Sequence, residues 1–143
     1  MKTIAFFNNK GGVGKTTLLY HVAWMYSELG LRTIAVDLDP QSNLTSMFLT
    51  EERIEDLGAG SVTGKTIVAA VAPLLEEGTG DIQSPHVEQV SQNLAIIPGD
   101  LGLARMEDEL SSQWSKSLDG NAKAFRITAA FHTVIQFAAN SFA

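Results

Sequence analysis

Cysteine is absent from the 143-residue sequence, and its absence excludes several kinds of site. Without thiols the chain has no disulfide, no thiolate-bound metal and no cysteine nucleophile. Long apolar runs are missing too, because no stretch approaches the roughly 18 apolar residues that a membrane span needs. The apolar run near the N-terminus is too short for the core of a signal peptide and lacks a cleavage site. These absences predict a cytoplasmic protein with no membrane association.

Basic residues are also scarce. Ten Lys and Arg residues stand against 16 Asp and Glu residues, which gives a formal net charge of −6. Surfaces that bind nucleic acid broadly carry a basic excess, so the charge argues against such a surface on this chain alone. Hydrophobic residues make up 45% of the sequence and charged residues 18%, as in globular proteins. A chain of this length can form one domain with a core, and we expect residues 1–143 to be a single domain.

Apolar patterning near the N-terminus predicts a strand, a helix and a second strand. Residues 2–7 (KTIAFF) and 32–37 (RTIAVD) are short, apolar and β-prone, which predicts two buried strands. Between them, residues 16–29 carry apolar side chains at helical spacing and end before Gly30. Strand, helix and strand in this order form a βαβ unit, which predicts a parallel sheet with a right-handed crossover.

The remainder of the chain shows looser patterns. Residues 43–57 could hold one or two short helices, and residues 58–64 are typical of a loop. The following segment predicts a helix interrupted or bent near Pro73. A short apolar strand is expected at 94–97, stopped by Pro98 and Gly99, and apolar spacing predicts further helices over 103–114 and 127–138.

The segment between the first expected strand and helix has the composition of a phosphate-binding loop. Glycines at 11, 12 and 14 allow backbone N–H groups to point inward at an anion, and the N-terminus of the helix favours the same anion. Lys15 would reach the β- and γ-phosphate oxygens, and the Thr16 hydroxyl would ligate Mg²⁺. The alternative, a plain glycine-rich turn, has no need of Gly-Lys-Thr-Thr at a helix start. The expected phosphate-binding residues are Gly11, Gly12, Val13, Gly14, Lys15, Thr16 and Thr17.

Two positions depart from the usual loop pattern. Asn9 stands where the first glycine is expected, and an additional lysine, Lys10, precedes Lys15 by five residues. Lys10 is either a solvated charge or a group directed at a nucleotide held by a second subunit. In the second case it would neutralise charge that develops during phosphoryl transfer, as an arginine finger does.

Two aspartates, Asp37 and Asp39, follow the second expected strand. Open α/β sheets place their ligands at the carboxyl ends of their strands, and alternation would direct both carboxylates to one side. One carboxylate could hold a metal-bound water and the other could orient an attacking water. The alternative is a pair of capping aspartates with Pro40 beginning a turn. The neighbouring loop favours the functional interpretation.

KGGVGKTT resembles the deviant Walker A motif of the ParA/MinD family of partitioning ATPases. VDLDPQSNLT is similar to the ParA-type segment, more than to the MinD form. The resemblance implies a P-loop NTPase fold, a mainly parallel sheet flanked by helices, with ATP and Mg²⁺ as cofactors and a homodimer in the ATP state. It assigns Lys10 to the partner's phosphates and Lys15 to the chain's own. It also assigns Thr16 to magnesium, Asp37 to the support of the magnesium shell and Asp39 to the attacking water.

The resemblance also implies that the chain is the N-terminal part of such a protein and ends before the Walker B strand. Asp100 is a weak candidate for the Walker B acid. The segment GSVTGKT at 60–66, which ends in TGKT, imitates a second phosphate loop without a preceding strand, and a surface loop that opens a helix is the favoured interpretation of it. A complete protein would act in plasmid or chromosome partitioning, associate with the nucleoid, bind nonspecific DNA through its C-terminal half and respond to a centromere-binding ParB-type protein. The alternatives are a noncatalytic nucleotide-binding or assembly module, a MinD-like membrane switch and an electron donor of the nitrogenase iron-protein type. The last needs cysteines that are absent.

Overall fold

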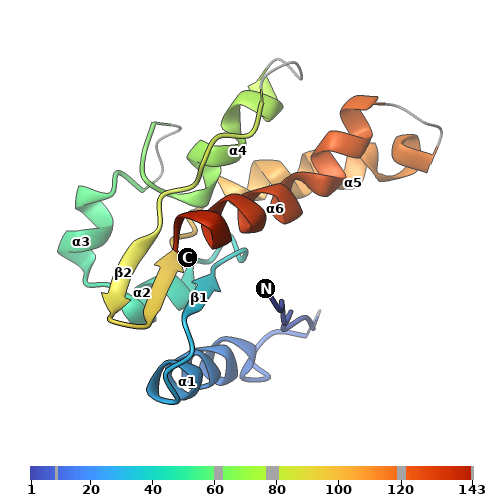
Figure 1. Ribbon diagram of the computed structural model, residues 1–143. Coiled ribbons are helices and arrows are strands. Elements are labelled where there is room, and N and C mark those ends of the chain that lie inside the picture. Colours follow the sequence, from blue (N-terminus) through green and yellow to red (C-terminus); the bar gives the residue numbers. More distant parts are fainter. Residues whose placement is uncertain (9, 60–62, 77–80, 119–121, 143) are drawn as a thin grey trace.

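The computed structural model describes residues 1–8, 10–59, 63–76, 81–118 and 122–142. In these residues a three-stranded sheet lies between two groups of helices (Figure 1). The elements in chain order are α1 (Lys15–Glu28), β1 (Thr33–Val36), α2 (Asn43–Phe48), α3 (Glu51–Asp56), α4 (Ile67–Glu76), β2 (Glu88–Ser91), β3 (Leu94–Ile97), α5 (Leu103–Leu118) and α6 (Ala122–Ser141).

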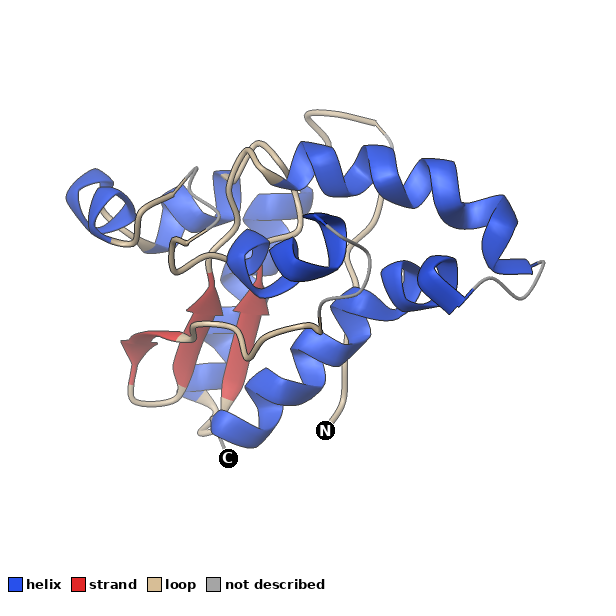
Figure 2. Cartoon of the chain, turned by 90° about the horizontal axis from the view of Figure 1, so that it is seen from above, coloured by secondary structure: helices blue, strands red, loops and turns tan. Residues whose placement is uncertain are grey.

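The sheet has the strand order β1-β3-β2 and is mixed (Figure 2). β1 and β3 are parallel, with Thr33 opposite Leu94 and Val36 opposite Ile97. β2 runs antiparallel to β3 and has an irregular register near Gln89. β2 was not predicted from the sequence. The parallel pair joined by helices nevertheless agrees with the expected α/β fold.

Alternation along the strands divides the core into two clusters, one on each face of the sheet. Ile34 and Val36 pack with Ile97 against α4, α5 and α6. Ala35 lies on the other face with residues of β3, against α1 and α2. All four residues of β3 are buried, as expected for a central strand covered on both faces.

Residues 2–7 are not a strand in the structure, contrary to the sequence prediction. The segment lies apart from the three strands in both views (Figures 1 and 2), and Phe7 is 90% exposed. Strand propensity needs a neighbouring strand with which to form hydrogen bonds, and β1 pairs only with β3 among the described residues. The N-terminal half of the expected βαβ unit is therefore not formed here.

The other predicted elements are confirmed within a few residues. α1, β1 and β3 lie where expected, 43–57 holds two short helices, and α4 contains Pro73. The expected helices over 103–114 and 127–138 correspond to α5 and α6, which pack against each other and extend away from the sheet (Figure 1). None of the described helices is both long and apolar enough to cross a bilayer.

Candidate functional site: the glycine loop before α1 and the end of β1

The loop before α1 has the backbone that its glycines predict. Gly12 and Gly14 have φ values of 70° and 84°, a left-handed conformation that residues with a side chain rarely adopt. Gly14 is the N-cap of α1, and its carbonyl accepts a hydrogen bond of 2.9 Å from the Leu18 N–H. No side chain in the described part of the chain caps the helix. The first N–H groups of α1 are thus available to a ligand.

The space beside the loop is open. A Cβ atom added at Gly11, Gly12 or Gly14 would meet no atom within 4 Å. A cavity of about 370 Å³ adjoins the loop. It is lined by Ala5, Phe6, Phe7, Asn8, Val13, Gly14, Lys15 and Leu18. Nothing among the described residues blocks an anion from reaching the loop backbone.

The two lysines of the loop differ in their surroundings. The Lys15 Nζ donates a hydrogen bond of 3.2 Å to the carbonyl oxygen of Lys10, which brings its ammonium across the loop. The Lys10 backbone N–H donates to the Asn8 Oδ1 at 2.9 Å. The Lys10 side chain is exposed and makes no hydrogen bond or ion pair with the described residues. One ammonium therefore serves its own loop, and the other remains available. Asn9 lies outside the described residues.

The two aspartates after β1 do not share one environment. Asp39 is exposed, and its Oδ1 accepts a hydrogen bond of 2.9 Å from the Gln41 N–H in a tight turn. Asp37 is only 3% exposed. Its Oδ2 accepts from the Thr45 N–H at 2.8 Å and from the Thr45 Oγ1 at 2.7 Å. Burial raises the pKa of Asp37, and the hydrogen bonds from Thr45 act in the opposite direction.

Asp100, the weak Walker B candidate, is a buried anchor. It accepts hydrogen bonds from the Thr66 hydroxyl and, at 2.6 Å, from the Gly102 N–H just before α5. It therefore joins the residue that precedes α4 to the start of α5. Thr66 belongs to the TGKT segment, so this imitation of a phosphate loop opens a helix, as one sequence interpretation expected. Residues 60–62 of that loop are outside the described part.

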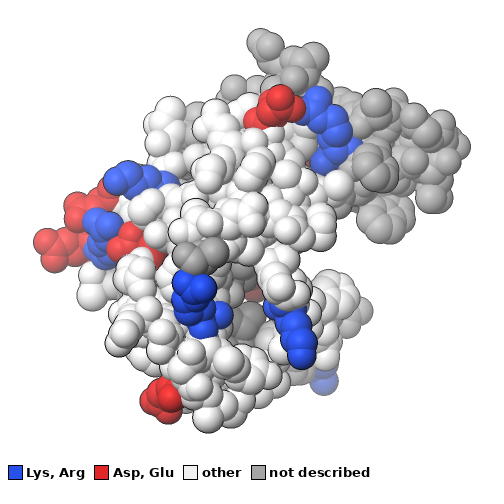
Figure 3. Space-filling model, viewed as in Figure 1, with Lys and Arg blue, Asp and Glu red and all other residues white. Residues whose placement is uncertain are grey.

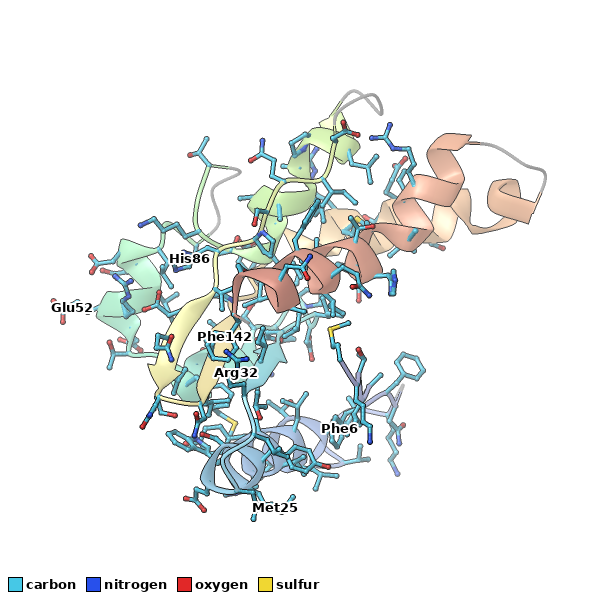
Figure 4. All side chains as sticks on the ribbon, viewed as in Figure 1. Phe6, Met25, Arg32, Glu52, His86 and Phe142 are labelled. Atoms are coloured by element: carbon cyan, nitrogen blue, oxygen red, sulfur yellow. The ribbon has the colours of Figure 1, made fainter. Side chains whose placement is uncertain are left out.

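Figure 3 shows a hollow on the viewed face, with basic side chains on both sides of it. Figure 4 places Arg32 between the sheet and α1, and Phe6 beside the start of α1.

The structure brings the predicted site residues together in two pairs. Lys10 and Lys15 meet in the loop, where the Lys15 Nζ donates to the Lys10 carbonyl oxygen. Asp37 and Asp39 are joined by a hydrogen bond of 3.3 Å from the Asp39 N–H to the Asp37 Oδ1. No hydrogen bond joins the aspartates to the loop in the described structure.

The residues of the loop fit a magnesium-bound nucleoside phosphate. Open glycine backbone, an uncapped helix start and the Lys15 ammonium supply donors for phosphate oxygens. Thr16 is half-buried in the first turn of α1, where its hydroxyl can serve as a magnesium ligand. Thr17 follows it and is exposed.

Thr45 is a residue of the site for which the sequence predicted no role. It lies eight positions after Asp37 and belongs to α2. Its side chain is 1% exposed and contacts the ends of both β1 and β3. The only signal in the sequence is a threonine within the segment that resembles the ParA type, which does not indicate a partner.

Known proteins resemble the chain in sequence and in fold. The model of the family described as "AAA domain" matches residues 1–136. The chromosome-partitioning ATPase Soj of Treponema pallidum is 32% identical over 82% of this chain and 40% of its own length. The crystal structure of protein DIP2308 from Corynebacterium diphtheriae has a TM-score of 0.83 and 32% identity over 99% of this chain. The structure of pNOB8 ParA bound to nonspecific DNA has a TM-score of 0.52 at 23% identity over 85% of this chain, a likeness of fold.

The chain spans 48% of the DIP2308 structure and 38% of the pNOB8 ParA structure. It thus accounts for less than half of these relatives. The family match, the relatives and the glycine loop agree with the resemblance read from the sequence. The chain belongs to the AAA-domain family and is a P-loop region of the ParA/MinD type, similar to partitioning ATPases over part of their length.

Proposed function

We propose that the chain is the nucleotide-binding part of an ATP- and Mg²⁺-dependent partitioning ATPase of the ParA type. One observation carries the proposal: the loop before α1 has an open glycine backbone with the Lys15 ammonium across it. In this function Lys15 and the loop N–H groups bind the phosphates and Thr16 binds the magnesium. Bound with Mg²⁺, ATP would supply the phosphoryl group for transfer to water with ADP as the leaving group, and Asp39 would orient that water.

The second part of the proposal is that ATP drives dimerisation and that Lys10 contacts the phosphates bound by the partner subunit. The Lys10 side chain is exposed and has no partner among the described residues, as a group that acts on a partner's phosphates must be. Two loops facing each other would place each Lys10 ammonium near the other subunit's nucleotide. Without nucleotide, the lysines of two facing loops would repel each other, because they carry like charges. A bound triphosphate would offset this repulsion and so couple nucleotide binding to association.

The wider role rests on the relatives. Two Soj relatives, from Treponema pallidum and Thermus thermophilus, are named chromosome-partitioning ATPases, and the pNOB8 ParA was solved on nonspecific DNA. We extend these properties to the whole protein of which this chain is part. It would act in plasmid or chromosome partitioning in the cytoplasm and on the nucleoid, with a centromere-binding ParB-type partner. The net charge of −6 leaves DNA binding to the rest of that protein.

Nucleotide binding tests the first part. Affinity for a fluorescent ATP analogue with Mg²⁺ should fall about tenfold or more in Lys15→Ala, because charge-assisted hydrogen bonds to phosphate are lost. Lys65→Ala is the matched control, since Lys65 is an exposed lysine in the TGKT segment that imitates the loop. Equal losses in both variants, or no binding by the wild type, would contradict the proposal.

Association and turnover test the rest. Lys10→Ala should retain nucleotide affinity and lose the nucleotide-dependent dimer that sedimentation velocity detects in the wild type. Asp39→Ala should retain binding and lose ATP turnover. A chain that binds ATP but shows no turnover, with or without Asp39, would instead be a noncatalytic nucleotide-binding module.

A further inference from the structure

The end of β1 is locked to the end of β3 by a hydrogen-bonded chain of three residues. The Gly99 N–H, just after β3, donates to the Thr45 Oγ1 at 3.0 Å. The Thr45 hydroxyl in turn donates to the Asp37 Oδ2 at 2.7 Å. The Thr45 N–H also donates to this oxygen. Thr45 lies in the first turn of α2, where backbone N–H groups have no acceptor within the helix, and Asp37 supplies one. We call these three residues the Asp37–Thr45–Gly99 latch.

The latch is buried and closely packed. Asp37 and Thr45 are 3% and 1% exposed. A Cβ atom at Gly99 would lie 2.8 Å from the main-chain oxygen of Asp37, so only glycine fits without a shift. The Gly99 N–H is also not available for another partner while Thr45 accepts from it. Three elements, β1, β3 and α2, are therefore fixed to one another at this point.

The latch also determines where Asp39 lies. The Asp39 N–H donates to the Asp37 Oδ1 at 3.3 Å, and both Asp37 oxygens are thereby engaged. Mg²⁺ requires near-ideal octahedral geometry with accessible oxygen ligands, which a carboxylate enclosed by protein donors does not offer. Asp39 is exposed, whereas Asp37 faces the interior.

We infer that Asp37 and Thr45 are positioning residues that fix the turn carrying Asp39, and that Asp37 does not ligate the magnesium. The part about magnesium rests on the proposed function, while the latch does not. This assignment differs from the one that the resemblance implies for Asp37. It adds Thr45, which no motif indicated, and leaves Thr16 as the magnesium ligand from this chain.

Amide hydrogen exchange tests the latch without any ligand. In Thr45→Val, which keeps the shape and removes the hydroxyl, exchange of the Gly99 amide should accelerate about tenfold relative to the wild type, the effect of losing one buried hydrogen bond. Thr45→Ser retains the hydroxyl and should restore slow exchange. The amide of Leu110 in α5, remote from the latch, reports whether the whole fold has loosened. Unchanged Gly99 exchange in Thr45→Val, or acceleration equal to that at Leu110, would overturn the positioning role.

Magnesium dependence tests the second part. We would measure the Mg²⁺ concentration that half-saturates binding of the fluorescent ATP analogue. Asp37→Asn should leave it within about twofold of the wild type, whereas Thr16→Val should raise it about tenfold, as expected on losing one ligand oxygen. An increase in Asp37→Asn as large as in Thr16→Val would overturn the inference.

These outcomes separate the inference from the proposed function. If the wild-type chain binds no nucleotide, the proposed function fails, and the exchange of Gly99 still decides whether the latch exists. If Asp37→Asn does not fold, as judged by circular dichroism, Thr45→Val provides the magnesium measurement in its place. Thr45→Val should leave the half-saturating Mg²⁺ concentration unchanged, or lower it if the freed carboxylate of Asp37 reaches the metal. An increase as large as in Thr16→Val would contradict the inference.

Discussion

The end of β1 and the loop before α1 carry the candidate site, and they are held in opposite ways. At the end of β1, the buried Asp37 accepts three hydrogen bonds from nearby groups. In the loop, the Lys10 N–H and the Lys15 Nζ make two hydrogen bonds, and the glycine backbone is exposed. At the end of β1 the polar groups of Asp37 are bound within the chain, whereas the loop has backbone N–H groups that no acceptor among the described residues binds.

This difference suggests a division of labour between the two regions. A site gains precision from a rigid support, and the end of β1 has the packing and hydrogen bonds to provide one. The loop collects positive charge and free N–H groups, which a bound triphosphate would satisfy. Substitutions at the end of β1 should therefore act on stability, and substitutions in the loop should act chiefly on binding.

A pair of glycines gives the sharpest test of this comparison. Gly99→Ala should lower the free energy of unfolding by about 1–3 kcal/mol, because its Cβ would press on Asp37. Gly11→Ala should change it by no more than about 0.5 kcal/mol, because its Cβ would enter open space. Urea denaturation of the two variants measures both values. Equal losses would show that the two regions do not differ in packing.

A second glycine of the loop refines the comparison. Gly14 has open space around it but a φ of 84°. Gly14→Ala should lower the free energy of unfolding by about 1–2 kcal/mol through backbone strain alone. Gly11, which does not have positive φ, is the control in the same loop. A loss in Gly11→Ala as large as in Gly14→Ala would mean that strain is not the cause.

The sequence predicted the parts of the structure that depend on local chemistry. The glycines of the loop, the start of α1 after Gly14 and the apolar runs of β1 and β3 all follow from nearby residues. The two parallel strands were recognisable because each is largely apolar on both faces. The loop was recognisable because few segments combine these glycines with a lysine and two threonines.

The parts that were missed depend on residues far apart in the chain. Residues 2–7 have strand propensity, yet a strand forms only beside a neighbour, and β1 pairs only with β3 in the described structure. β2 escaped notice because Glu88, Gln89 and Ser91 are polar and its register is irregular. The burial of Asp37 depends on Thr45 and on the end of β3, and alternation along one strand could not reveal it.

The ion pair between Arg53 and Glu88, on the edge strand β2, should give the smallest effect on stability. It is more exposed to solvent than the buried latch, so its contribution should depend on pH. Glu88 in β2 accepts hydrogen bonds from the Arg53 guanidinium of α3 at 2.8 and 3.0 Å. The hydrogen bond from Arg53 lowers the pKa of Glu88 below its ordinary value of 4.5. The native state therefore keeps Glu88 ionised at pH values where the unfolded chain takes up a proton. This contribution to stability is present above about pH 4.5 and is lost as the pH falls through the folded pKa.

Glu88→Gln should accordingly lower the free energy of unfolding at neutral pH, and its difference from the wild type should shrink as the pH falls below about 4.5. Urea denaturation between pH 3 and pH 7, a range of about four units around the ordinary carboxyl pKa, measures the difference. Glu52→Gln is the control, because Glu52 is exposed on the same helix as Arg53 and points away from the sheet (Figure 4). A Glu88→Gln difference that stays constant over this range would mean that Arg53 does not hold Glu88 ionised. The contribution of the Arg53–Glu88 pair to stability would then come from hydrogen-bond geometry and not from the charge of Glu88.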